Sequence, residues 1–282
     1  MKKLLIGCNC YLGQNILNEN KDCLEDWCIS SRNKKTDLLS DCNVSFIQSD
    51  ITKDNNLYGL NVEELYLISR PYNNDFNEHF NFHCSLKNII INLCSINNIK
   101  KIVFPSSQMV YESTDEKVDL NTNVIPYGVY EYFKIDMEIF LKYIYLNYNV
   151  EFVNIYRLPI LFGGIINEKQ NEEQYLYSFI NNFKLGKTWN FENDREKDYG
   201  VSWCYMSDLV NEFKSNKQGY RIINSSSGFI NYFNLNNFMI KTLQLKSDKN
   251  QKLYKSRMEM QNNSNLAQKD FLELLKNNVD NL

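Results

Sequence analysis

The segment that decides the fold runs from Lys3 to Gly13 and reads KLLIGCNCYLG. A short apolar run ends at Gly7, and a helical pattern follows it. A buried strand, a tight glycine turn and a helix, in this order, open a dinucleotide-binding unit, where glycines let the backbone approach a pyrophosphate and the helix N-terminus supplies unpaired N–H groups. Gly7 and Gly13 fit this pattern. Cys10 replaces its middle glycine and narrows the room for phosphates, and an ordinary strand-to-helix turn is the alternative.

Beyond this turn, short apolar runs alternate with helical stretches, which predicts a doubly wound α/β fold with a parallel sheet. The strands expected after the first span residues 27–30, 44–47, 65–68, 101–104 and 151–157, with a helix over 86–96. The later part of the chain predicts a helix over 175–185, a strand over 201–205 and a terminal helix over 266–275. Ligands bind outside the carboxyl ends of the strands in such sheets, so chemistry is expected at Ser106 and Ser107, which follow the 101–104 strand.

Tyr130 and Lys134 are four residues apart in a segment whose apolar stripe predicts a helix. This spacing places both side chains on one helix face, where an ammonium can act on a phenol. The spacing alone is weak evidence, and simple packing of Tyr130 against the core is the alternative. The prediction of an active site therefore depends on the order of three features along the chain. These are the glycine turn, the serines at the end of a strand, and the Tyr130–Lys134 pair.

Composition limits the remaining classes of protein. The 282 residues, 43% of them hydrophobic, are enough for a full core in one large domain or two closely joined ones. A net charge of −3 without a basic stripe makes nucleic acid and anionic membranes unexpected partners. Without a membrane-spanning run or a signal-peptide pattern, we expect a cytoplasmic protein. Eight scattered cysteines and two histidines, His79 and His83, predict reduced thiols and no metal site.

Taken in order, these motifs resemble the extended short-chain dehydrogenase/reductase family, in particular its nucleotide-sugar epimerases, dehydratases and ketoreductases. The resemblance covers about residues 1–230 and is strongest over 101–163. It implies a dinucleotide-binding Rossmann domain over 1–163. Residues 164–282 would form a small α+β region that mainly binds substrate, with parts returning to the Rossmann domain.

The resemblance also implies a mechanism of hydride transfer with Ser107, Tyr130 and Lys134 as the catalytic residues. Tyr130 would exchange a proton with the substrate oxygen, Ser107 would hydrogen-bond that oxygen, and Lys134 would hold the nicotinamide ribose. A unit charge at about 4 Å and an effective dielectric constant of about 20 gives roughly 4 kcal/mol. We therefore expect Lys134 to lower the Tyr130 pKa by about three units, from about 10 to roughly 7.

Further site residues follow from the same resemblance. The expected cofactor-binding residues, besides Tyr130 and Lys134, are Gly7, Cys10, Tyr11, Leu12, Gly13, Ser31, Arg32, Asp50, Ile51, Ser69 and Pro159. The expected substrate-binding residues are Ser107, Gln108, Met109, Arg157 and Arg195. The second strand ends at Ser31-Arg32 without the acid that usually holds the ribose hydroxyls of NAD. A guanidinium beside hydroxyls suits a 2′-phosphate, so we expect NADP(H) as the cofactor. The alternatives are NAD(H) as the cofactor and an Arg32 that is merely exposed to solvent and has no role in binding.

Three departures from the family pattern stand out: Cys10, His83 where many members carry asparagine, and Val201 where an arginine often meets the substrate diphosphate.

The favoured function is an NADP(H)-dependent reductase of a 4-keto nucleotide-diphosphate sugar in surface-polysaccharide or deoxysugar biosynthesis. A nucleotide-sugar epimerase with tightly bound NAD is the first alternative. A dehydratase is less favoured, because Gln108 and Met109 stand where dehydratases usually place an Asp-Glu pair. A non-catalytic dinucleotide sensor is the last alternative. The apolar segments 89–96 and 133–146 are suited to a homodimer, with a monomer as the alternative.

Overall fold

The computed structural model describes residues 2–33, 44–71, 73–112, 116–165, 175–191, 193–243, 249–250, 257–261 and 270–278. The chain divides into two compact units. The first comprises Met1–Tyr111, Asn123–Arg157 and Val210–Ile223, and the second comprises Glu112–Thr122, Leu158–Leu209 and Asn224–Leu282. The division thus falls after Arg157 rather than after residue 163, because the strand Ile160–Phe162 pairs with a strand of the second unit.

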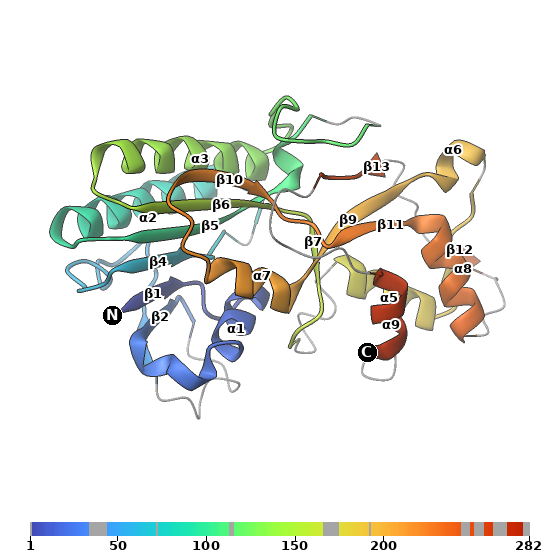
Figure 1. Cartoon of the computed structure of the whole chain (residues 1–282), viewed down its shortest axis with the longest axis horizontal. Coiled ribbons are helices and arrows are strands. Elements are labelled where there is room, and N and C mark those ends of the chain that lie inside the picture. Colours follow the sequence, from blue (N-terminus) through green and yellow to red (C-terminus); the bar gives the residue numbers. More distant parts are fainter. Residues whose placement is uncertain are drawn as a thin grey trace. The chain divides into compact units, whose positions relative to one another are not determined.

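A seven-stranded sheet forms the centre of the first unit, with the order β10-β6-β5-β4-β1-β2-β3 (Figure 1). β1 pairs in parallel with both β2 and β4, which places Leu5 opposite Ile29 and Tyr66. This order confirms the predicted doubly wound parallel sheet. Its strands are β1 (Lys3–Ile6), β2 (Trp27–Ser31), β3 (Ser45–Gln48), β4 (Glu64–Leu67), β5 (Lys101–Ser107), β6 (Phe152–Leu158) and β10 (Gly219–Asn224).

Helices cover both faces of this sheet. α2 (Phe76–Ile96) and α3 (Val129–Asn147) lie side by side on one face, and α1 (Tyr11–Asn18) lies on the other (Figure 1). Short 3-10 turns follow α1 at Lys21–Asp26 (η1) and β5 at Gln108–Val110 (η3). The strands β4 and β5 are buried along their whole length, as expected of strands covered on both faces. The buried central strands therefore determine the edge of the sheet at which their carboxyl ends reach the surface.

The second unit is a mixed α and β region, as the sequence predicts. Its larger sheet has the order β11-β9-β13, with β7 also paired to β9, and its smaller sheet pairs β12 with β8. Phe162, Trp203 and Phe271 make ring contacts within it. The strands are β7 (Ile160–Phe162), β8 (Lys187–Thr188), β9 (Gly200–Tyr205), β11 (Gly228–Asn231), β12 (Lys249–Asn250) and β13 (Arg257–Met258). The helices are α5 (Tyr175–Lys184), α6 (Asp194–Lys197), α7 (Met206–Phe213), α8 (Tyr232–Leu243) and α9 (Phe271–Asn278). Of the terminal helix predicted over 266–275, residues 266–269 lie outside the described residues.

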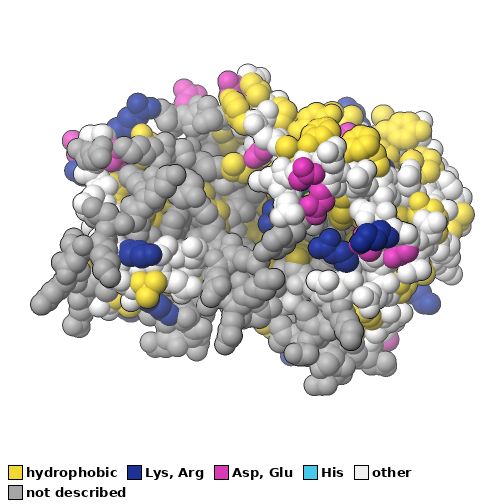
Figure 2. Space-filling model, turned by 180° about the vertical axis from the view of Figure 1, so that it is seen from behind, with side chains coloured by type: hydrophobic (Ala, Val, Ile, Leu, Met, Phe, Trp, Pro, Cys, Tyr) yellow, Lys and Arg dark blue, Asp and Glu magenta, His cyan; other side chains and the backbone are white. Residues whose placement is uncertain are grey.

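An apolar surface covers part of α2 and α3, where Figure 2 shows hydrophobic side chains gathered at the upper right. Ile89 and Ile90, on which the expected dimer surface partly depends, are instead buried in the core between α2 and the sheet. The exposed apolar side chains of these two helices are Phe76, Phe80, Ile96, Tyr132, Ile139, Tyr143 and Leu146.

The described residues contain neither a membrane-spanning helix nor a cluster of metal ligands. No helix among them combines the length and the apolar character needed to span a membrane. Within the same residues, no group of three or more His, Cys, Asp or Glu side chains is arranged to hold a metal ion.

Candidate active site

The glycine turn after β1 is set by two close backbone approaches. Gly7 has φ +102°, and a Cβ atom on it would lie 2.7 Å from the backbone nitrogen of Ser69. A Cβ atom on Gly13 would lie 2.3 Å from the carbonyl oxygen of Gly7. Gly7 is therefore needed for the close approach of the segment after β4, and Gly13 for the close approach of α1 to the turn.

Cys10 takes a specific role in this turn as the N-cap of α1. Its φ of −78° is an ordinary extended value, so a side chain there causes no backbone strain. The Cys10 Sγ accepts a hydrogen bond from the Gly13 N–H at 3.3 Å. The thiol therefore competes with any phosphate for one of the amides that the helix N-terminus presents.

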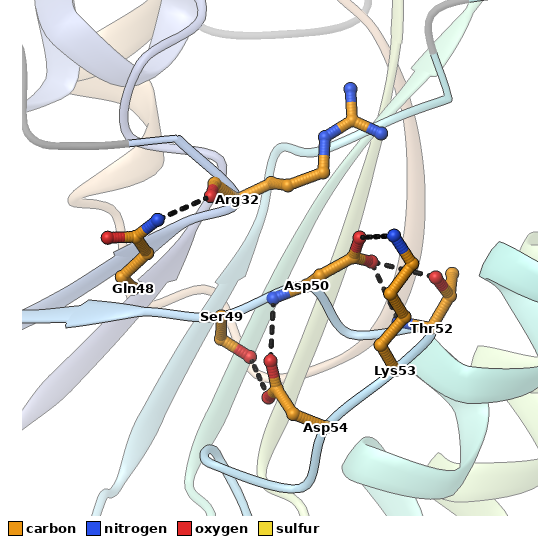
Figure 3. A network of polar contacts seen from close by, with 7 residues as sticks. All are labelled: Arg32, Gln48, Ser49, Asp50, Thr52, Lys53 and Asp54. Atoms are coloured by element: carbon orange, nitrogen blue, oxygen red, sulfur yellow. Dashed lines mark hydrogen bonds and ion pairs between the residues drawn. The ribbon is translucent and has the colours of Figure 1, made fainter.

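The ends of β2 and β3 lie next to each other and carry Arg32 and Asp50 (Figure 3). The Arg32 side chain is exposed, and its backbone carbonyl accepts a hydrogen bond from Gln48 Nε2 at 3.2 Å. The Asp50 carboxylate accepts from Thr52 Oγ1 at 2.7 Å and lies 3.3 Å from Lys53 Nζ. Desolvation acts to raise the Asp50 pKa, but these partners outweigh it and hold the pKa below its ordinary value.

The remaining expected residues of this edge are fixed by local contacts. Ser31 Oγ accepts from Asn9 Nδ2 at 2.8 Å, which ties the end of β2 to the glycine turn. Ile51 is buried in the core beside the sheet. The structure thus brings the glycine turn, Ser31 and Arg32 to one edge of the first unit.

The two serines at the end of β5 have different partners. Ser106 Oγ donates to Glu138 Oε1 at 2.5 Å and so faces α3. Ser107 Oγ accepts from the Met109 N–H at 3.2 Å, and its hydroxyl is also hydrogen-bonded to that of Tyr130. This pairing supports Ser107, rather than Ser106, as the hydroxyl that acts with Tyr130.

Tyr130 and Lys134 lie in the first two turns of α3, which begins at Val129. Lys134 Nζ donates to the carbonyl oxygen of Pro105 at 2.6 Å and lies 5.5 Å from the centre of the Tyr130 ring. Desolvation of this buried ammonium, helped by the charge of Arg70, lowers the Lys134 pKa to about 7, although Glu138 acts to raise it.

The Tyr130 pKa differs from the expectation. Desolvation raises it above its ordinary value, and the groups that act to lower it are Arg70 and Ser107. Lys134 was expected to lower the Tyr130 pKa to roughly 7, and that expectation is wrong for this structure. The expectation considered one neighbouring charge and left out burial of the phenol, which has the largest effect on this pKa and raises it.

Arg70 is the residue of this site that the sequence reasoning missed. Its Cζ atom lies 5.6 Å from the centre of the Tyr130 ring. Arg70 follows β4 by three residues, and β4 lies between β1 and β5 in the sheet. The signal that would have found it is therefore positional: a cation at the carboxyl end of the strand between the glycine turn and the serine strand.

Arg157 is held in a buried network. Its Nε and Nη2 donate to the two carboxylate oxygens of Glu138 at 3.1 and 2.7 Å, and its Cζ lies 4.7 Å over the Tyr111 ring. The side chains of both members of this ion pair are about 5% exposed. The geometry therefore does not support the expected contact of Arg157 with substrate, because its guanidinium is committed to Glu138.

Two further expected substrate residues, Gln108 and Met109, directly follow Ser107. Gln108 is buried, whereas the Met109 side chain is 44% exposed. His83, at the position where an asparagine was expected, stacks flat on Phe133 with ring centres 4.9 Å apart. Desolvation lowers the His83 pKa to about 3, so this imidazole is neutral.

The other expected residues belong to the second unit and are described within it. Pro159 is buried between β6 and β7, and Arg195 is exposed on α6. Val201 is buried in β9. The sequence expectation that Arg195 binds substrate stays a prediction.

Together, the parallel sheet, the glycine turn after β1 and the Ser107, Tyr130 and Lys134 set define an extended short-chain dehydrogenase/reductase. The sequence model described as the NAD dependent epimerase/dehydratase family matches residues 4–214, and the chain belongs to that family. No curated protein sequence matches the chain.

Solved structures of several nucleotide-sugar enzymes have the same fold. The ADP-L-glycero-D-manno-heptose-6-epimerase of Helicobacter pylori superposes with a TM-score of 0.80 at 14% identity, over 99% of this chain and 96% of that chain. The UDP-glucose 4-epimerase of Thermotoga maritima, solved with UDP-glucose, gives 0.75 at 13% identity, over 98% and 92%. The dTDP-glucose 4,6-dehydratase of Streptomyces venezuelae, solved with NAD, gives 0.72 at 14% identity, over 99% and 98%.

Proposed function

We propose that this chain is a nicotinamide-dinucleotide-dependent enzyme that exchanges a hydride at a sugar carbon of a nucleotide sugar. The observation that carries the proposal is the hydrogen bond between Ser107 and Tyr130 at the end of β5, with Lys134 one turn further along α3. Membership of the NAD dependent epimerase/dehydratase family supports it. The similar structures support it as well, since they include proteins solved with NAD or a nucleotide sugar.

The residues present fit a dinucleotide. Gly7 leaves no side chain between the turn and Ser69, Gly13 leaves none between the turn and α1, and the N-terminus of a helix such as α1 offers backbone N–H groups to a phosphate. Ser31 and Arg32 stand at the carboxyl end of β2, Asp50 follows β3, and Ser69 lies against Gly7; these residues would hold the adenosine half. When bound, the nicotinamide supplies or accepts the hydride.

The chain's own residues handle the proton. Tyr130 donates its phenolic proton to a ketone oxygen, or accepts a proton from an alcohol in the reverse direction. Ser107 hydrogen-bonds the same oxygen and fixes its position. Lys134, which donates to the Pro105 carbonyl, would orient the nicotinamide ribose.

NADP(H) is the cofactor that we favour. Arg32 is exposed and directly follows Ser31, so a guanidinium and a hydroxyl stand together where NAD-specific members place an acid. The favoured reaction is accordingly the reduction of a 4-keto nucleotide-diphosphate sugar for a surface polysaccharide or deoxysugar, in the cytoplasm.

An epimerase with tightly bound NAD is the second candidate, and the family match and the similar epimerase structures favour it. Release of nucleotide from the denatured, freshly purified protein separates the two candidates. The reductase predicts an empty protein that oxidises added NADPH with a 4-keto nucleotide sugar. Co-purified NAD, with interconversion of a nucleotide sugar and no net NADPH consumption, would instead identify the epimerase.

Tyr130→Phe is the matched control for either reaction, because it removes one hydroxyl and keeps the ring. Loss of turnover in this variant, with dinucleotide binding retained, supports the proposal. Dinucleotide binding by the wild-type chain without any nucleotide-sugar reaction would favour a non-catalytic sensor.

A second copy of this chain is the partner that we propose for the apolar surface of α2 and α3. The exposed side chains of Phe76, Phe80, Tyr132 and Ile139 are aromatic or aliphatic and lie on neighbouring helices. Sedimentation equilibrium of the wild type and of Ile139→Lys tests this, with a dimer expected for the wild type and a monomer for the variant.

A further inference from the structure

An exposed arginine, Arg70, stands at the carboxyl edge of the sheet between the glycine turn and Tyr130. It follows β4, which lies between β1 and β5 in the sheet. Its Cζ atom lies 5.6 Å from the centre of the Tyr130 ring. The preceding residue, Ser69, packs so closely on Gly7 that a Cβ atom there would lie 2.7 Å from the Ser69 nitrogen. The backbone of Arg70 therefore leaves the sheet directly beside the glycine turn.

The charge of Arg70 also reaches Cys10, the N-cap of α1. Desolvation raises the pKa of the Cys10 thiol, whereas the Arg70 charge acts to lower it, so the guanidinium lies near the start of α1 as well as near Tyr130. Among the residues that the structure describes, no carboxylate forms an ion pair with Arg70. An exposed guanidinium in this position is suited to an anionic ligand.

We propose that Arg70 binds the diphosphate of the dinucleotide and replaces the amide contact that Cys10 removes. The inference rests on the proposed function, in which the glycine turn and α1 hold this diphosphate. Cys10 Sγ accepts from the Gly13 N–H at 3.3 Å, so the protein itself engages one of the amides at the start of α1. A guanidinium can donate two parallel hydrogen bonds to one phosphate, and it adds a full positive charge.

Lys134 and Arg32 are less suited to this contact. Lys134 is buried and donates to the Pro105 carbonyl at 2.6 Å. Arg32 follows β2, which the strand order places on the far side of β1 from β4. The strand order therefore separates the two arginines, with Arg32 on the adenosine side of the glycine turn and Arg70 on the side of Tyr130. The diphosphate joins the two halves of the dinucleotide, so it would lie between them.

The test is calorimetric titration of NADPH, NADH and ADP-ribose into the nucleotide-free wild type and into Arg70→Gln. ADP-ribose carries the diphosphate but lacks the nicotinamide. We expect Arg70→Gln to weaken all three ligands by the same factor, at least about tenfold, because a hydrogen bond between charged groups is lost. Arg70→Lys keeps the charge and should recover part of the affinity. Lys142→Gln, which removes an exposed cation from α3, should bind as the wild type does.

A double-mutant cycle with Cys10→Gly tests whether Arg70 replaces the lost amide contact. Cys10→Gly frees the Gly13 N–H for the diphosphate, so Arg70 is needed less in that background. We expect Arg70→Gln to weaken ADP-ribose binding only about threefold there, against about tenfold in the wild type. Equal losses in the two backgrounds would contradict the replacement. Since Arg70 is exposed, urea unfolding of Arg70→Gln should match that of the wild type.

Three results would overturn the proposal, and they have different meanings. An unchanged affinity of Arg70→Gln for all three ligands would show that the guanidinium does not contact the dinucleotide. A loss confined to NADPH and NADH would place Arg70 beside the nicotinamide rather than the diphosphate. A wild type that binds none of the three ligands would overturn the proposed function as well, so the failure of that function is distinguishable from the failure of this inference alone.

Discussion

Glu138 of α3 receives both nitrogen arms of the Arg157 guanidinium, from Nε at 3.1 Å and from Nη2 at 2.7 Å, at the end of β6. The same carboxylate accepts from Ser106 at the end of β5. One buried carboxylate thus joins α3, β5 and β6 directly behind Ser107 and Tyr130. These are the elements that carry the proposed catalytic residues Ser107 and Tyr130 or lie next to them.

Breaking this pair should destabilise the fold strongly. Glu138→Gln leaves a buried guanidinium without its counter-charge, which costs about 3–5 kcal/mol in comparable buried pairs. Asp136→Asn is the matched control on the same helix, because its pair with Lys87 is partly exposed and is worth about 1 kcal/mol or less. Urea unfolding measures both, and equal losses in the two variants would contradict the assigned role of Glu138.

The glycine turn makes a second prediction. Gly13→Ala would place a Cβ atom 2.3 Å from the Gly7 carbonyl oxygen, so α1 must move away from the turn. We expect a loss of stability of about 1–3 kcal/mol and at least a tenfold weaker dinucleotide affinity. Gly128→Ala is the control, because its Cβ would meet only the end of the flexible Glu131 side chain. Unaltered NADPH affinity in Gly13→Ala would place the dinucleotide elsewhere.

Replacement of Cys10 by glycine is expected to strengthen dinucleotide binding. Cys10→Gly removes the thiol that accepts the Gly13 N–H, so this amide becomes available to a phosphate. We expect a severalfold lower Kd for NADPH in calorimetry. The free energy of unfolding should fall by roughly 0.5–1 kcal/mol from the lost cap and the added backbone freedom. Weaker binding would show that the thiol assists the cofactor rather than competing with it.

The lowered pKa of Lys134 predicts that the free energy of unfolding depends on pH. Its pKa is 10.5 ordinarily and about 7 in the folded chain, so between these values the unfolded state holds a proton that the folded state lacks. Stability therefore rises with pH in this window, by up to about 1.4 kcal/mol per unit. Between about pH 7 and about pH 9, the wild type should gain roughly 2 kcal/mol more than Lys134→Met in urea unfolding. A parallel pH dependence of the two proteins would mean that the buried ammonium keeps its charge.

Much of the fold was predictable because local pattern and burial agree in it. β1, β4 and β5 are covered on both faces, so they read as apolar runs, and the helix with Lys134 carries a clear apolar stripe. The Gly7 and Gly13 positions were visible because only glycine tolerates those approaches. These features depend on short stretches of sequence, which is why they can be read from it.

The partners of the charged residues were not predictable in the same way. Arg70 and Tyr130 are 60 positions apart, and nothing in the sequence near either residue indicates their contact. Arg157 was expected at the substrate, yet its partner Glu138 lies on a different element that reaches it only through the packing of α3 on the sheet. The expectation of a lowered Tyr130 pKa was wrong for a related reason, because burial of the phenol depends on how the elements pack and raises this pKa.

The most direct test of the central claim is a calorimetric titration of NADPH and NADH into the freshly purified chain and into Arg32→Ala, after removal of any co-purified nucleotide. The account predicts that NADPH binds more tightly than NADH to the wild type. Arg32→Ala should remove that preference while retaining NADH binding. Preference for NADH in the wild type would reverse the cofactor choice. Absence of binding by NADPH, NADH and their oxidised forms would contradict the claim that this chain is a dinucleotide-dependent enzyme.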